Sequence, residues 1–111
     1  MATVHGILFY SPSCIHCHAV MTETLPPLRD EYGAQLRIVE LDITTARGRA
    51  VFKSAIDALS IPIDAVPMLV VGDSILLGRD EIADRLPALI EAGLAAGGID
   101  WPAIPAFVPP E

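Results

Sequence analysis

Two thiols follow an apolar run in the stretch Ile7-Leu8-Phe9-Tyr10-Ser11-Pro12-Ser13-Cys14-Ile15-His16-Cys17. The apolar run predicts a buried strand, and the residues after Cys14 predict a helix. A helix N-terminus presents unpaired N–H groups and the positive end of the helix dipole, which favour a thiolate at the first cysteine. We therefore expect Cys14 to be a nucleophile. Cys17 is spaced to close a disulfide with it, or to resolve a mixed disulfide that Cys14 has formed.

The length and composition indicate one domain with an acidic surface. A chain of 111 residues can bury a core of its own. Both cysteines are in the motif, so none remains to build a structural disulfide framework. Acidic residues outnumber basic ones by 14 to 7, which gives a net charge of −7. This balance argues against a nucleic-acid partner or an anionic membrane surface, and we expect a monomer.

The N-terminal residues 1–6 have neither the basic region nor the apolar region of a secretory signal. No uncharged apolar run in the sequence is long enough to cross a bilayer. Such a start is equally compatible with a domain excised from a longer protein, whose targeting segment this chain then lacks.

Hydrophobic periodicity and turn residues predict alternating strands and helices. We expect strands at Val4–Tyr10, 36–43, Met68–Val71 and Ser74–Leu77, with Gly72-Asp73 as the turn of a hairpin. We expect helices at 15–32, from Thr44 or Thr45 to Leu59, and from Asp80 to Gly97-Gly98. The pair Pro26-Pro27 predicts a break in the first helix near Leu25.

This order predicts an α/β domain with three layers, α/β/α, and a mixed four-stranded sheet in which the first strand is central. The order of elements is β-α-β-α-β-β-α, and the domain is expected to span residues 1–98. Residues 99–111 predict a strap lying on the domain or the beginning of a linker. This tail is rich in proline, with Pro102, Pro105, Pro109 and Pro110.

A second motif, Ala65-Val66-Pro67-Met68-Leu69-Val70-Val71-Gly72-Asp73, leads into the hairpin. With both motifs, the chain resembles the thioredoxin-like superfamily over roughly residues 4–96. The resemblance implies a thiol-disulfide oxidoreductase that needs no cofactor and acts on protein thiols and disulfides. It also implies that Pro67 follows a cis peptide bond beside the disulfide, and that the backbone of Val66 pairs with a bound substrate strand.

A narrower resemblance comes from Asp100-Trp101-Pro102 near the C-terminus. Together with the motifs above, it is similar to the thioredoxin-like domains associated with vitamin K epoxide reductase homologues. That resemblance implies a partner in the membrane that forms disulfides with a quinone as oxidant. An alternative is that this chain is the electron-carrier domain of such a membrane enzyme, with the proline-rich tail as its tether.

The chain departs from thioredoxin in two features. Thioredoxin has Gly-Pro between its cysteines and a buried acid beneath them, whereas this chain has Ile15-His16 and, on the preceding strand, Leu8. A histidine just before the second cysteine resembles the disulfide oxidase DsbA and the protein disulfide isomerases. His16 would stabilise the Cys14 thiolate and make the couple more oxidising. We therefore expect an oxidising or isomerising role in an extracytoplasmic space rather than a cytoplasmic reductase.

Without a buried acid, the resolving thiol lacks an evident proton acceptor. Water, His18 and Glu23 are the alternatives that the sequence offers.

The same thiols are compatible with bound metal. A structural zinc site needs four ligands. Besides His16 and His18, the sequence has one further histidine, His5. The spacing Cys14-Ile15-His16-Cys17-His18 also matches c-type haem attachment, although a strand-turn-helix context argues against it. Paired thiolates would hold Cu(I) in a metal-delivery module. We expect disulfide exchange, with no metal site and no cofactor.

Overall fold

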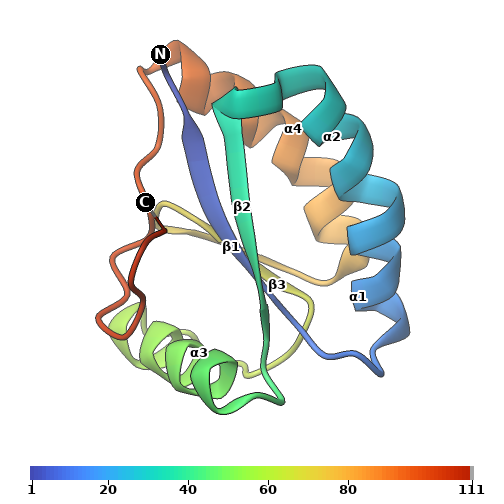
Figure 1. Ribbon diagram of the computed structural model, residues 1–111, viewed down its shortest axis with the longest axis vertical. Helices are drawn as coiled ribbons and strands as arrows, with labels where there is room; N and C mark the ends of the chain where they lie inside the picture. Colours follow the sequence, from blue (N-terminus) through green and yellow to red (C-terminus); the bar gives the residue numbers. More distant parts are fainter. Residues whose placement is uncertain (111) are drawn as a thin grey trace.

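The computed structural model describes residues 1–110 and places helices on both faces of a single sheet (Figure 1). The strands are β1 (Val4–Tyr10), β2 (Leu36–Asp42), β3 (Met68–Val71) and β4 (Ser74–Leu77). The helices are α1 (Ile15–Ala19), α2 (Leu25–Tyr32), α3 (Ala46–Ala58) and α4 (Arg79–Ala95). A π-helical turn, η1 (Val20–Thr24), joins α1 to α2, and a 3-10 turn, η2 (Gly33–Gln35), joins α2 to β2.

The strand β1 is central in the sheet, whose order is β2-β1-β3-β4. It runs parallel to β2 and antiparallel to β3, which in turn pairs antiparallel with β4. Helices cover both faces of β1, so its residues Ile7, Leu8 and Phe9 are fully buried. The predicted mixed four-stranded sheet with a central first strand is therefore confirmed.

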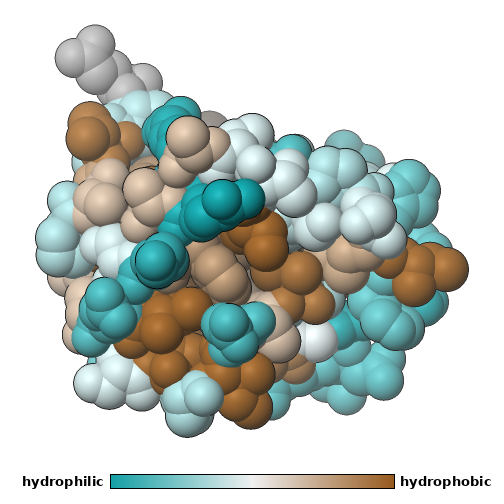
Figure 2. Space-filling view, turned by 90° about the horizontal axis from the view of Figure 1, so that it is seen from below, coloured by the Kyte–Doolittle hydropathy of each residue, from teal (hydrophilic) through white to brown (hydrophobic). Residues whose placement is uncertain are grey.

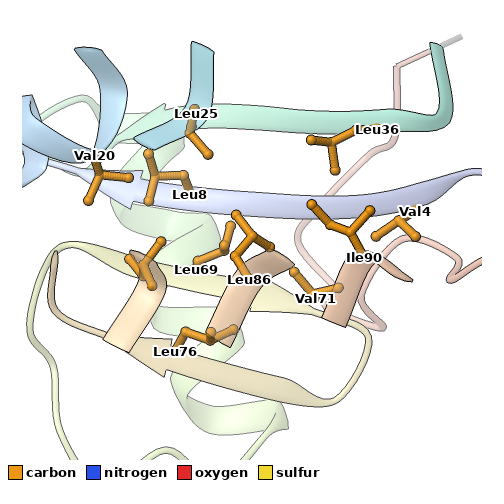
Figure 3. Packing of buried hydrophobic residues seen from close by; sticks show 11 residues of the cluster. Val4, Leu8, Val20, Leu25, Leu36, Leu69, Val71, Leu76, Leu86 and Ile90 are labelled. Atoms are coloured by element: carbon orange, nitrogen blue, oxygen red, sulfur yellow. The ribbon is translucent and has the colours of Figure 1, made fainter. Parts of the chain in front are cut away.

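Two apolar clusters fill the space between the sheet and its helices. On one face, Leu8 and Leu69 of the sheet meet Val20 of η1, Leu25 of α2 and Leu86 of α4 (Figure 3). On the other face, β1, β2 and β3 pack against α3 and residues from the C-terminal segment. Burial of this apolar surface on both faces is the main favourable contribution to folding.

The first helical region is continuous from α1 through η1 to α2. Pro26 and Pro27 have no N–H to donate, so they cannot complete the helical ladder at their positions. The chain accommodates them in α2's first turn and widens the preceding turn, where the N–H of Leu25 bonds to the carbonyl of Val20. The irregularity thus lies in η1, one turn before the break that the sequence predicts near Leu25.

The C-terminal segment lies against the domain and passes beside α3 (Figure 1), where the Ala106 N–H donates to Ser54 Oγ at 3.1 Å. Ile99 pairs with the start of β1, because its N–H bonds to Thr3 O at 2.9 Å and its carbonyl accepts the His5 N–H at 3.0 Å. Further along, Ile104 and Phe107 are buried in the cluster on the α3 face. Up to Phe107, the tail therefore has the contacts of a strap.

Candidate functional site

Cys14 occupies the N-cap position of α1, directly after a turn that ends β1. The turn is closed by the Cys14 N–H, which donates to Ser11 O at 3.0 Å. The Cys14 Sγ accepts the backbone N–H of Cys17 at 3.1 Å. Because this N–H is one of the unpaired donors at a helix start, it stabilises negative charge on the sulfur. The local fold thus favours a thiolate at Cys14.

The two cysteines form a disulfide, and their exposures differ. Their Cα atoms are 5.2 Å apart, within the ordinary range for a disulfide. Cys14 is only partly buried, whereas Cys17 is fully buried beneath the first turn of the helix. A second molecule can therefore reach Cys14 Sγ and not Cys17 Sγ.

The segment before β3 lies beside this sulfur. The Val66–Pro67 peptide bond is cis, as the family resemblance implies. The carbonyl oxygen of Val66 lies 3.9 Å from Cys14 Sγ. Within residues 1–110, neither the N–H nor the C=O of Val66 has a backbone hydrogen-bond partner. These free groups can pair with an extended chain that approaches Cys14.

A groove of about 570 Å³ extends from this point to the start of α4. The hairpin register produces it: Met68 pairs with Leu77, so Gly78 lies opposite Pro67 and its N–H bonds to Pro67 O at 2.9 Å. The lining residues are His16, Val66, Pro67, Leu77, Gly78, Arg79, Asp80 and Glu81. The last five were not predicted as site residues, although the hairpin that brings them to Pro67 was.

The two histidines next to the disulfide in sequence line different hollows of the surface. His16 is exposed and lines the groove with Val66 and Pro67. His18 is also exposed and lines a hollow of about 80 Å³ together with Cys14 and Tyr10. Glu23, the other proton acceptor considered above, pairs with Arg79 at 3.6 Å. Of the two side-chain alternatives, only His18 shares a hollow with Cys14.

Within residues 1–110, no buried acid lies beneath the disulfide. Leu8 is fully buried where thioredoxin has its acid, and none of the buried side chains in residues 1–110 is polar or charged. Across the same residues, no group of three or more His, Cys, Asp or Glu side chains is arranged to hold a metal ion.

The end of the molecule that carries this site also exposes apolar side chains. Ile15, next to Cys14, is 76% exposed, and Ile63, three residues before Val66, is 53% exposed. Figure 2 views the molecule from below in Figure 1, and it shows apolar side chains reaching the surface among hydrophilic ones on that face. Apolar surface of this kind suits contact with another polypeptide. Within residues 1–110, no helix has both the length and the apolar character needed to span a membrane.

Comparisons with solved structures identify the fold. No model of a known family matches the sequence, and no curated protein does. Thioredoxin O2 from Arabidopsis thaliana, in its oxidized state, is similar in structure with a TM-score of 0.56 and 21% identity, over 82% of this chain and 75% of that one. Thioredoxin-2 of the malaria parasite has a TM-score of 0.53 and 21% identity, over 81% and 82%. The protein therefore has the thioredoxin fold.

A glutaredoxin is among the similar structures too. Glutaredoxin C1 from Populus tremula x tremuloides has a TM-score of 0.50 and 20% identity, over 78% of this chain and 83% of that one. At these identities the likeness shows the fold alone, and it does not distinguish thioredoxins from glutaredoxins. On this fold, the chain carries a Cys-x-x-Cys disulfide at the start of α1.

Proposed function

We propose that this protein exchanges disulfides with protein thiols through Cys14 and Cys17. One observation carries the proposal: the reachable sulfur of a disulfide lies 3.9 Å from the carbonyl of Val66, whose backbone groups are free to pair with an incoming chain. The exposed side chains of Ile15 and Ile63 add apolar surface that suits a polypeptide substrate. No cofactor is needed for this chemistry.

In the oxidising direction, a substrate thiolate attacks Cys14 Sγ and the Cys14–Cys17 bond breaks. Cys17 leaves as a thiolate and takes up a proton, while the substrate and Cys14 are joined in a mixed disulfide. A second substrate thiolate then attacks the substrate sulfur of this bond and releases the Cys14 thiolate. Two electrons have moved from the substrate dithiol to the protein, and a low-molecular-weight disulfide such as oxidised glutathione can accept them in turn.

The helix start favours the oxidising direction, because it stabilises the thiolate that the second step releases. The Cys17 N–H at 3.1 Å from Cys14 Sγ supplies one hydrogen bond to this thiolate. A stabilised thiolate means a stabilised reduced protein, and hence a more oxidising couple. We propose an oxidising or isomerising role in an extracytoplasmic space, where such couples act. A partner of the membrane quinone-linked type remains a prediction from Asp100-Trp101-Pro102.

The proposal is tested with a reduced, unfolded protein as substrate and oxidised glutathione as the final oxidant. We expect catalytic amounts of this protein to form substrate disulfides faster than oxidised glutathione does alone. Mass analysis after alkylation counts the disulfides over time. The control is the same protein with both cysteines alkylated after reduction. If the unmodified protein and this control give the same rate, the proposed function is wrong.

His16 is expected to make the couple more oxidising. In His16→Pro we expect the reduction potential to fall by roughly 30 mV or more, which is tenfold in the equilibrium constant for this two-electron couple. Proline is tolerated there because the first-turn N–H groups have no helical partner. The potential is measured by equilibration in glutathione buffers, followed by alkylation and mass analysis.

Two matched variants separate the imidazole from other effects. His16→Gln keeps the backbone and removes the imidazole, so it should shift the potential in the same direction as His16→Pro. His18→Gln is the control, because it makes the same change at the histidine that lines the smaller hollow with Cys14. An unchanged or more oxidising potential in both His16 variants would remove His16 from the mechanism.

A further inference from the structure

Charged residues line the groove beside Cys14, and some of them form ion pairs within the domain. Arg79 pairs with Glu23 at 3.6 Å. Glu81 accepts the backbone N–H of Leu77 at 2.6 Å and lies 3.8 Å from Arg85. Both of these lining charges therefore have partners within the domain.

Asp80 differs from its neighbours in the groove. Its side chain is exposed, and no ion pair or side-chain hydrogen bond engages it within residues 1–110. The groove lining itself holds the two carboxylates of Asp80 and Glu81 and one guanidinium group, that of Arg79. One negative charge is thus in excess, and the net charge of −7 adds to it at longer range.

A chain that pairs with the free backbone of Val66 lies at one end of this groove. Its neighbouring side chains then lie along the apolar lining of Pro67 and Leu77 toward the start of α4. A lysine or arginine there would meet the carboxylate of Asp80, whereas a glutamate would be repelled. Charge complementarity therefore indicates which polypeptides fit.

We propose that the groove selects thiol-bearing polypeptide segments with a lysine or arginine close to the reacting cysteine, and that Asp80 is the residue that recognises this cation. The inference rests on the proposed function, since it concerns the substrate of the same exchange. The sulfur chemistry is unchanged: substrate thiols lose two electrons as their disulfide forms, and the Cys14–Cys17 disulfide gains them. Asp80 contributes to binding and takes no part in the electron transfer.

The test uses two dithiol peptides that differ only in carrying lysines or glutamates beside their cysteines. The oxidised protein is mixed with each peptide at about pH 8, where peptide thiols are partly ionised, and the loss of its disulfide is followed in a single turnover. Flanking charges also change the ionisation of the peptide thiols. The measured quantity is therefore the ratio of the lysine-peptide rate to the glutamate-peptide rate, compared between protein variants on the same two peptides.

We expect Asp80→Asn to lower this ratio by roughly two- to five-fold, as for the loss of one exposed charge pair. Asp84→Asn is the matched control, because it removes the same charge from an exposed position of α4 outside the groove. The wild-type ratio should also fall as salt is added, since exposed charges are screened.

Equal ratios in Asp80→Asn, Asp84→Asn and the wild type would overturn the assignment of Asp80. An equal fall in both variants would overturn it too, because the preference would then come from net charge alone. If the wild type oxidised neither peptide, the proposed function would fail and this inference with it. If the wild type oxidised both peptides at the same rate, exchange would stand and the inferred charge selection would fail.

Discussion

Replacing Cys14 with serine is expected to slow exchange by at least about 1000-fold, because a serine hydroxyl is not ionised near neutral pH and cannot replace a thiolate. Replacing Cys17 with serine should have a different result. Cys14 stays reachable in that variant, and its attack on a substrate disulfide is retained, while the sulfur that resolves the mixed disulfide is missing. Mixed disulfides between Cys14 and substrate should then accumulate.

The test compares how much mixed disulfide each of the two variants accumulates. Each reduced variant is incubated with a disulfide-bonded peptide, quenched with acid, and analysed by mass without reductant. The mixed disulfide should dominate in Cys17→Ser and be absent in Cys14→Ser. Cys14→Ser should unfold at a temperature close to that of the reduced wild type, because Cys14 is only partly buried. Cys17→Ser should unfold at a lower temperature, because it places a hydroxyl at a fully buried position. Accumulation in Cys14→Ser instead would show that Cys17 is the nucleophile, against its complete burial.

The arrangement of the sheet could be predicted because its signals are local. An uninterrupted apolar run at β1 is typical of a strand covered on both faces, and Gly72-Asp73 is typical of a two-residue hairpin turn. The structure has that hairpin, with Val71 paired to Ser74 and Gly72 at a φ of 61°. The position of the helix irregularity was harder to predict from the sequence. Proline excludes a regular ladder, but it does not say which turn will widen.

Part of the site could also be predicted, because its sequence signals are local. Cys14 and Cys17 are neighbours in sequence, and a strand followed by a helix places them at a helix start. The other side of the groove depends on the hairpin register. The sequence places Asp80 at the start of a predicted helix, and the structure has it in the first turn of α4. Its place in the groove beside Val66 and Pro67 follows only once Gly78 lies opposite Pro67. Tertiary proximity of this kind has no local sequence signal.

The structural role of Gly48 could not be predicted from the sequence either. Its local sequence does not distinguish it from an ordinary helix residue. It is buried in the first turn of α3, where its N–H donates to Thr45 Oγ1 at 3.0 Å. Thr45 Oγ1 in turn donates to the carbonyl oxygen of Asp42 at 2.8 Å, at the end of β2. The turn between β2 and α3 is therefore closed tightly around this carbonyl.

Gly48→Ala is expected to destabilise the protein. A Cβ at this position would overlap with the carbonyl oxygen of Asp42 and lie 2.6 Å from its carbonyl carbon. Both atoms belong to the backbone, so the β2–α3 connection would have to shift. We expect a loss of about 2–3 kcal/mol, lowering the melting temperature by roughly 10–20 °C.

The sign of the effect makes this a sharp test. In a helix interior without steric conflict, alanine is more favourable than glycine by about 1 kcal/mol, so propensity alone predicts stabilisation. Arg49→Ala is the matched control, because Arg49 is the next residue of α3 and is exposed. Its melting temperature should stay close to that of the wild type. A Gly48→Ala variant that melts at or above the wild-type temperature would mean that the β2–α3 turn is looser than its hydrogen bonds indicate. A loss confined to Gly48→Ala would show that this glycine is required by the close approach of the Asp42 carbonyl and not by the conformation of α3.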